Sequence, residues 1–304
     1  MRVGITVDDP DTVVDEARRA EALDFDYLGC GEHLFFHGPT PNSFAMLAAA
    51  AAVTSRIRLV TSIALLPLYP AAVVAKMASV IDCISDGRFE LGVGAGGEFP
   101  PEFAAASVDV RTRFRRLDEG IEVIRRLFAG GSVTFEGTYA RLSGLALDPP
   151  PRRPGGPPIW LGGSKNGALR RVGRYADVWM PYMVDPEQMR VGLAKVRSAA
   201  ADNERSADAV SAALFAWAAV DVDSSWARST GVGAVSAAYS QDFSPLADRY
   251  LLIGSPDAVV ERLAQFRSAG VDTVIIQIAA DSAEHRSRIV ETFASRVLPI
   301  VRDL

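Results

Sequence analysis

The chain has 304 residues, of which 49% are hydrophobic and 23% are charged, and its formal net charge at pH 7 is −5. This balance is typical of a globular protein with a sizeable core, and an acidic chain without a basic stripe argues against a nucleic-acid partner. No apolar run reaches the roughly 18 residues of a membrane span, and the N-terminus lacks a signal-peptide pattern, so we expect a cytoplasmic protein without a membrane partner. Two cysteines, Cys30 and Cys83, are too few for a disulfide framework.

The first half of the chain alternates between short β-rich runs and amphipathic helical stretches. Its predicted strands are Arg2–Val7, Asp26–Gly31, Ile57–Leu65 and Arg88–Val93. The helices predicted after each strand are Asp11–Leu23, Phe44–Val53, Ala71–Ile84 and Arg111–Phe128. In the last of these helices apolar side chains recur every three or four positions, the spacing of a helix packed on a core.

A Pro- and Gly-rich connector from Ala129 to Pro158, with a small hairpin predicted around Glu136, precedes the second half, where the same alternation resumes. Its predicted strands are Pro158–Leu161, Ala176–Pro181, Val210–Val220 and Val271–Ile278. Its predicted helices are Ala168–Tyr175, Pro186–Ala201, Pro256–Ser268 and Ala283–Val301. The polar segment Asp223–Tyr250 is expected to be irregular.

Eight strands that alternate with eight helices imply parallel strands joined by right-handed crossovers. We therefore predict a single α/β domain over residues 1–304, a (β/α)8 TIM barrel with the insertion Asp223–Tyr250 near its C-terminal mouth. An open, doubly wound sheet is the alternative on this pattern alone. In a barrel of this kind the active site lies at the carboxyl ends of the strands.

The second predicted strand ends in Glu32 and His33, an imidazole beside a carboxylate. Such a pair can transfer protons near neutral pH, although a histidine at a strand end can also serve only as a hydrogen-bonding group. His33 and His37 have the spacing of zinc ligands on a helix, but Gly38 and Pro39 follow at once and argue against a helix. We therefore expect no metal site.

Two glycine-rich turns follow later strands. Residues Gly92 to Gly97 match G-x-G-x-x-G, but Phe99-Pro100-Pro101 follows in place of a helix, which argues against a nicotinamide site. Glycines there still allow the backbone to approach a flat ring or the sheet closely. The second turn, Gly162-Gly163-Ser164, precedes a helix that begins near Asn166, an arrangement that suits a phosphate or a tight turn with a serine cap.

In their order and spacing, these segments resemble the bacterial luciferase-like monooxygenase superfamily of flavin- and deazaflavin-dependent oxidoreductases. The resemblance covers nearly the whole chain. It is carried by Gly31-Glu32-His33, Thr61-Ser62-Ile63, Ser85-Asp86-Gly87-Arg88-Phe89, Leu91-Gly92-Val93-Gly94-Ala95-Gly96, Pro158-Ile159-Trp160-Leu161-Gly162-Gly163 and Gly254-Ser255-Pro256.

The resemblance implies a barrel, usually dimeric, with a flat cofactor ring in its mouth. His33 would be the catalytic proton donor or base, with Glu32 beside it. A non-prolyl cis peptide would join Ser62 and Ile63. The cofactor-binding residues implied are Thr61, Ser62, Ile63, Gly94, Ala95, Gly96, Glu98, Gly162, Gly163 and Ser164. Phe99-Pro100-Pro101 departs from the family pattern beside Glu98.

The resemblance also bears on the cofactor. Flavin members often carry an arginine in the fourth-strand segment, whereas this chain has Ala95 there and no arginine until Arg111. This difference, and an arginine-rich composition typical of actinobacteria, favour coenzyme F420 over FMN. The expected activity is hydride transfer between F420 and a small organic substrate. The alternatives are a two-component monooxygenase that uses reduced FMN, O2 and a separate reductase, or a non-catalytic flavin-binding barrel.

Overall fold

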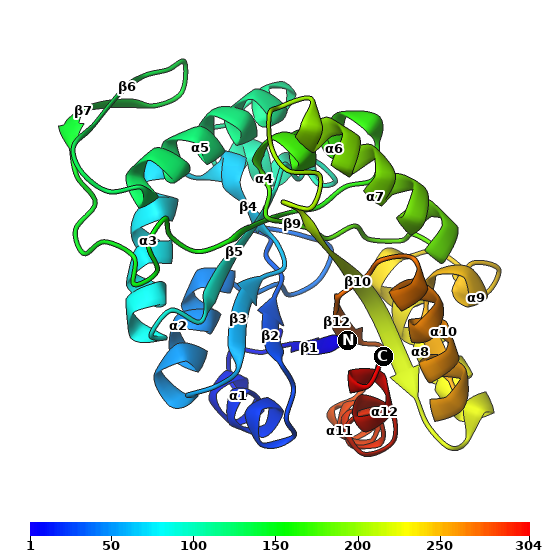
Figure 1. Ribbon diagram of the computed structural model, residues 1–304. Helices are drawn as coiled ribbons and strands as arrows, with labels where there is room; N and C mark the ends of the chain where they lie inside the picture. Colours follow the sequence, from blue (N-terminus) through cyan, green and yellow to red (C-terminus); the bar gives the residue numbers. More distant parts are fainter.

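A computed structural model describes all residues from Met1 to Leu304 (Figure 1). Eight parallel strands follow one another around a closed barrel, because the seventh strand pairs with both the sixth and the eighth, and the eighth pairs with the first. These strands are β1 (Arg2–Thr6), β2 (Tyr27–Cys30), β3 (Arg58–Thr61), β5 (Phe89–Gly94), β8 (Ile159–Leu161), β9 (Val178–Trp179), β10 (Ser211–Val220) and β12 (Thr273–Ile278). The predicted TIM barrel is confirmed, and the open doubly wound sheet is wrong.

Helices surround the barrel, and a large apolar core of 72 buried residues fills the space between the two layers. The eight helices that follow the barrel strands are α1 (Val13–Ala22), α2 (Ser43–Val53), α3 (Ala71–Ile84), α5 (Arg113–Phe128), α6 (Asn166–Tyr175), α7 (Pro186–Ala201), α10 (Pro256–Ser268) and α11 (Ala283–Thr292). None of the helices combines the length and the apolar character that crossing a membrane requires.

The inside of the barrel holds a second, smaller core. Its buried side chains are Tyr27, Val60, Trp160, Val178, Met180, Ala213 and Ile275. Below them the buried Glu90 accepts hydrogen bonds from Trp160 Nε1 at 2.6 Å and from Arg58 Nη1 at 2.6 Å. The amino-terminal end of the barrel is therefore filled, which leaves the carboxyl end of the strands as the open mouth.

The third predicted strand is interrupted where the family resemblance implies a bulge. β3 ends at Thr61, the Ser62–Ile63 peptide bond is cis, and β4 (Ala64–Leu65) continues by pairing with β5. A 3₁₀ turn, η1 (Leu66–Leu68), leads from β4 toward α3. The cis peptide expected at this position is thus confirmed.

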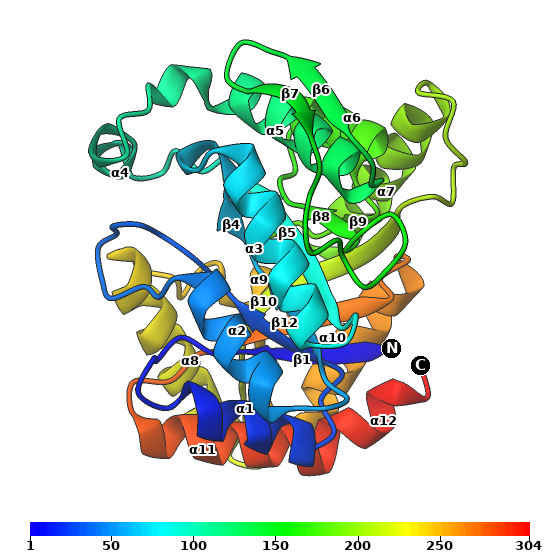
Figure 2. The ribbon, with the colours of Figure 1, turned by 90° about the vertical axis from the view of Figure 1, so that its left-hand side faces the viewer.

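The segment Asp223–Tyr250, expected to be irregular, is mostly helical, so that expectation is wrong. It forms α8 (Ser224–Tyr239) and α9 (Ala247–Tyr250), followed by β11 (Leu252–Gly254), which pairs with β10. The carboxylate of Asp223 caps α8 by accepting from the backbone N–H groups of Ser225 and Trp226. Figure 2 shows α8 at the left-hand end of the barrel, toward which the strands run.

Six further elements, in three segments of the chain, complete the fold. The segment after β5, which showed no pattern in the sequence, contains α4 (Pro100–Ala105) and the 3₁₀ turn η2 (Val110–Thr112). The predicted hairpin is present as β6 (Val133–Glu136) and β7 (Arg141–Leu145). The last predicted helix is divided by a π-helical turn, η3 (Phe293–Val297), before α12 (Leu298–Arg302), because Pro299 has no N–H group to continue the α-helical ladder.

Candidate active site

The inward-facing positions continue past the inner core and form the rim of the mouth. Side chains alternate between the two faces of a strand, so the residue two positions after an inner core residue also faces inward. On this alternation Ile275 is followed by Gln277, and Met180 is followed by Tyr182. The same rule gives a ring of residues from different strands: Ser62, Gly94, Gly162, Tyr182, Trp217 and Gln277.

Glycines form the part of the mouth that adjoins the Ser62–Ile63 bulge. A Cβ atom on Gly92 would lie 1.9 Å from the Thr61 carbonyl oxygen, and one on Gly94 would lie 2.5 Å from Ile63 Cδ1. Gly162 contacts the same isoleucine side chain, with 3.3 Å from its hypothetical Cβ to Ile63 Cδ1. The glycines therefore permit the bulge to pack directly on β5, with the Ile63 side chain lying over Gly94 and Gly162. These glycines and the isoleucine that covers them form a floor, the glycine floor, that suits a flat ring.

The bulge carries two polar side chains, those of Thr61 and Ser62. The Thr61 hydroxyl donates to the Gly92 carbonyl oxygen at 2.7 Å, which ties the bulge to β5. The Ser62 hydroxyl is buried and has no hydrogen-bond partner. Since buried polar groups are rarely left unpaired, this hydroxyl fits a bound group with a hydrogen-bonding edge.

His33 stands beside the floor, just beyond the end of β2. Its Nδ1 atom lies 3.2 Å from both carboxylate oxygens of Glu102, a fully buried side chain on α4. The carboxylate also accepts from the backbone N–H of Leu34. Because the carboxylate favours a hydrogen on Nδ1, Nε2 is the ring nitrogen that remains free to give or take a proton.

Aromatic rings surround this histidine. Phe36 stacks on the His33 imidazole, with 4.2 Å between ring centroids and 20° between the planes. His37 and Phe99 meet Phe36 edge to face. The loop after β2 and the loop after β5 therefore form one apolar wall around the imidazole.

Glu32 does not pair with its neighbour His33. Its buried carboxylate accepts hydrogen bonds from the Ser43 backbone N–H and hydroxyl, from Asn42 Nδ2 and from the Tyr69 hydroxyl, at 2.9 to 3.1 Å. Burial and the adjacent carboxylate raise the pKa of Tyr69. These contacts fasten the start of α2 to the barrel, and the carboxylate that accompanies His33 is that of Glu102. The contacts of Glu32 suit a positioning role better than the catalytic role expected from the sequence.

Replacing Glu32 with alanine is expected to lower the free energy of unfolding by about 3 kcal/mol, because four donors lose a buried acceptor. Urea denaturation followed by circular dichroism measures this loss. Glu261, an exposed residue of α10, provides the matched control, and its alanine variant should change stability by less than about 0.5 kcal/mol. Equal stabilities of the two variants would contradict the structural role of Glu32.

Three of the predicted cofactor-binding residues, Ala95, Gly96 and Glu98, lie in the turn after β5, the fourth strand of the barrel. Ala95 and Gly96 are half-buried at the mouth, whereas Glu98 is exposed and lies within electrostatic reach of the Tyr182 hydroxyl. A Cβ atom on Gly97 would lie 2.7 Å from Nε of Arg113, the first residue of α5. This buried Nε has no partner. An arginine thus does reach the glycine turn, from a part of the chain that sequence reasoning did not connect with it.

The Gly162-Gly163-Ser164 turn lies directly before α6. The residue at the N-cap position is Lys165, and no side chain caps the helix, so the serine cap considered from the sequence is not formed. The Gly163 carbonyl oxygen accepts from Trp179 Nε1 at 2.9 Å, which holds the turn against β9. The uncapped helix start leaves backbone N–H groups available to an anion such as a phosphate.

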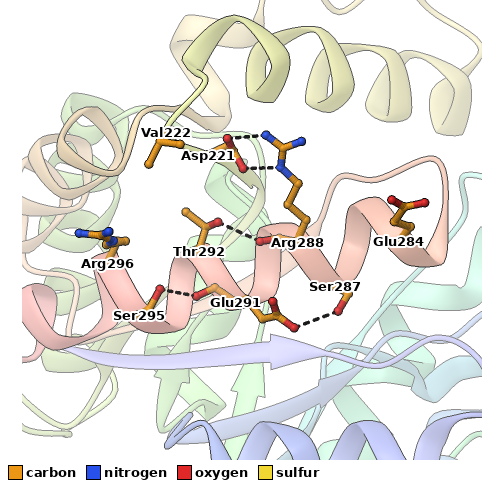
Figure 3. Close-up of a pocket in the computed structure, with 9 residues that line it drawn as sticks. All are labelled: Asp221, Val222, Glu284, Ser287, Arg288, Glu291, Thr292, Ser295 and Arg296. Carbon is orange, nitrogen blue, oxygen red and sulfur yellow. Dashed lines mark hydrogen bonds and ion pairs between the residues drawn. The ribbon is translucent and has the colours of Figure 1, made fainter.

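A separate hollow of about 710 Å³ lies outside the barrel against α11 (Figure 3). It is lined by Asp221, Val222, Glu284, Ser287, Arg288, Glu291, Thr292, Ser295 and Arg296. Asp221 and Arg288 pair within it through two hydrogen bonds of 2.7 Å. Since only one lining residue is hydrophobic, this hollow offers no apolar surface for a flat ring, and the mouth is the better candidate site. No group of His, Cys, Asp and Glu side chains could hold a metal ion.

Comparisons with known proteins show which family the chain resembles. The chain is 34% identical to an uncharacterized protein of Mycobacterium tuberculosis over 174 residues. That match covers 57% of this chain and 59% of the relative's length. The chain is 28% identical to the FMNH(2)-dependent dimethylsulfone monooxygenase of Pseudomonas fluorescens, over 95% of this chain and 86% of that protein. It is 26% identical to the F420-dependent glucose-6-phosphate dehydrogenase of M. tuberculosis, over 97% and 95% of the two chains.

The fold is shared over the whole chain with a solved structure. The crystal structure of the monooxygenase RslO1 from Streptomyces bottropensis superposes with a TM-score of 0.86 and 27% identity, covering 98% of this chain and 99% of that one. Residues 2–249 match the family model described as luciferase-like monooxygenase. The protein therefore belongs to the luciferase-like monooxygenase family.

Proposed function

We propose that this protein is an oxidoreductase that transfers a hydride between coenzyme F420 and a small organic substrate at the barrel mouth. The observation that carries the proposal is the pairing of His33 with the buried Glu102 beside a floor of glycines. Both cofactors occur among the relatives, F420 in the one at 26% identity and reduced FMN in the one at 28% identity. When bound, the deazaflavin ring supplies or accepts the hydride.

The residues of the mouth have separate tasks in this proposal. Gly94 and Gly162 leave room for the Ile63 side chain, on which the ring lies, and the Ser62 hydroxyl donates to or accepts from the edge of the ring. The backbone N–H groups of Gly163 and Ser164 bind the cofactor phosphate at the start of α6. His33 Nε2 gives a proton to the substrate during reduction and takes one during oxidation, while Glu102 holds the imidazole in place.

Equilibrium binding tests this assignment. Titrating the tryptophan fluorescence of the protein with F420 and, separately, with FMN should show at least about tenfold tighter binding of F420. Tighter binding of FMN would overturn the choice of F420. Binding of neither cofactor would overturn the enzyme proposal and leave a non-catalytic barrel.

One observation favours FMN as a second candidate. The sequence argument against FMN was the lack of an arginine near Ala95, yet the Arg113 guanidinium lies on Gly97 with an unpaired buried Nε. It could hold a cofactor phosphate, as could the start of α6. The second candidate function is therefore a monooxygenase that uses reduced FMN, O2 and a separate reductase, and dependence of turnover on oxygen separates it from the first.

Changing Arg113 to glutamine is expected to weaken binding of the preferred cofactor about tenfold, the value of one charge-assisted hydrogen bond. The same fluorescence titration measures the change. Arg111→Gln is the matched control, because Arg111 is highly exposed and pairs only with Asp109. Cofactor affinity that is equal in the two variants would show that Arg113 does not contact the cofactor.

A further inference from the structure

A hydrogen-bonded network of two tyrosines and one tryptophan lies at the mouth. Tyr182 follows β9, Tyr239 ends α8, and Trp217 belongs to β10. Tyr182 also forms an isolated bridge with Phe215 of β10. Trp217 is two residues further along β10, on the same inward face. Its Nε1 donates to the Tyr182 hydroxyl at 2.9 Å, and that hydroxyl lies 2.5 Å from the hydroxyl of Tyr239, the last residue of α8.

This network has three polar hydrogens, one on Trp217 and one on each tyrosine, and one of the three has no protein partner. The indole N–H can only donate, so the Tyr182 oxygen accepts from it. The two hydroxyls share one further hydrogen bond, in one direction or the other. Three hydrogens thus serve two hydrogen bonds, and one hydroxyl hydrogen remains free to donate to an acceptor outside the network.

Tyr239 is the more exposed of the two tyrosines. This residue is 39% exposed, whereas Tyr182 is half-buried between the rings of Phe215 and Tyr239. An unpaired hydrogen costs more on the half-buried Tyr182 than on Tyr239, where solvent or a ligand can accept it. Tyr182 therefore donates to Tyr239, and the free hydrogen is that of Tyr239.

We propose that the Tyr239 hydroxyl binds an oxygen atom of the substrate, and that the substrate is a conjugated carbonyl compound or the corresponding alcohol. Two aromatic pairs, Phe36 with Phe99 and Tyr239 with Phe243, offer ring surfaces that suit a flat, conjugated skeleton. This inference rests on the proposed function and names its substrate class. Tyr182 acts through Tyr239 and is a positioning residue.

A hydrogen bond from Tyr239 serves the proposed reaction directly. It draws electron density from the carbonyl carbon, the atom to which the hydride adds. A bound reduced cofactor would supply the hydride that forms the new C–H bond, while the C=O π pair moves to oxygen and the proton from His33 completes the alcohol. The two electrons gained by the carbonyl would come from that cofactor.

The test uses 4-(dimethylamino)cinnamaldehyde, a flat aldehyde whose visible absorption moves to longer wavelength when its oxygen accepts a hydrogen bond. Added to protein loaded with oxidised cofactor, it should bind and show this shift. Tyr239→Phe should abolish the shift and weaken binding about tenfold. Tyr182→Phe should retain the shift with a lower affinity, because it removes only the group that positions Tyr239.

Tyr175→Phe is the matched control, since Tyr175 ends α6 at the opposite end of the barrel, and it should leave both shift and affinity unchanged. A shift that persists in Tyr239→Phe, or loaded wild-type protein that shows none, would overturn the role of Tyr239. Cofactor loading is read separately from tryptophan fluorescence. Protein that takes neither F420 nor FMN would instead overturn the proposed function, a result distinguishable from failure of the tyrosine proposal.

Discussion

Changing His33 to asparagine is expected to lower kcat about 100- to 10,000-fold, the usual contribution of a positioned proton donor or base. Asparagine can keep a hydrogen bond to Glu102 but cannot exchange a proton near neutral pH, so folding and cofactor affinity should change little. The measurement is the rate of cofactor oxidation or reduction with the best substrate from a panel of small carbonyl compounds and alcohols. A variant that keeps more than half of the wild-type kcat would contradict the assignment of His33.

The protein contains its own control for this experiment. His285 at the start of α11 pairs with Asp281 through Nδ1 at 2.5 Å, so it is also an imidazole held by a carboxylate, but on the outer helical layer. His285→Asn should retain full activity. Glu102→Gln tests the orientation of His33 and should lower kcat at least about tenfold while leaving cofactor affinity unchanged.

Changing Gly92 to alanine is expected to destabilise the protein by about 3 kcal/mol or more and to remove cofactor binding. The new Cβ would lie 1.9 Å from the Thr61 carbonyl oxygen and 3.0 Å from Ile63 Cγ2, so the bulge must move away from β5. This movement displaces the Ser62 hydroxyl and the floor on which the ring is proposed to lie. Urea denaturation measures the first effect and fluorescence titration the second.

Gly233→Ala is the control for this change. Gly233 lies within α8, and a Cβ atom there would meet nothing within 4 Å. Alanine should stabilise the protein by about 0.5 to 1 kcal/mol, because it favours the helix more than glycine does. If Gly92→Ala were as stable as Gly233→Ala, the close packing of the bulge on β5 would be wrong.

The barrel could be predicted from the sequence because most of its strands and helices have a local pattern of apolar residues. The runs around β1, β5 and β12 are apolar and short, and α5 has a regular apolar face. α8 lacks such a face, since it is rich in alanine, serine and glycine and is fixed by its Asp223 cap and by packing on β10 and β11. Its helical state therefore depends on tertiary contacts that local patterns do not encode.

The site was predictable where one chain segment supplies it and was missed where two distant segments meet. His33 and the glycine turns follow single strands, and the sequence indicated them. Glu102 reaches His33 from 69 residues further along the chain, and Arg113 reaches Gly97 from the start of α5, beyond α4. The expected pairing of Glu32 with His33 is not formed, because adjacent residues on an extended segment point to opposite faces. The carboxylate next to His33 in sequence is therefore not next to it in space.

The central claim is that the cofactor lies on the glycine floor at the barrel mouth. Amide hydrogen exchange, measured by mass spectrometry with and without saturating F420, tests it most directly. The proposed site predicts slower exchange over residues 92–98 and 162–166 and in the loop that carries His33. Slower exchange confined to the charged hollow around Asp221 and α11, or no change at the mouth while F420 is bound, would contradict it.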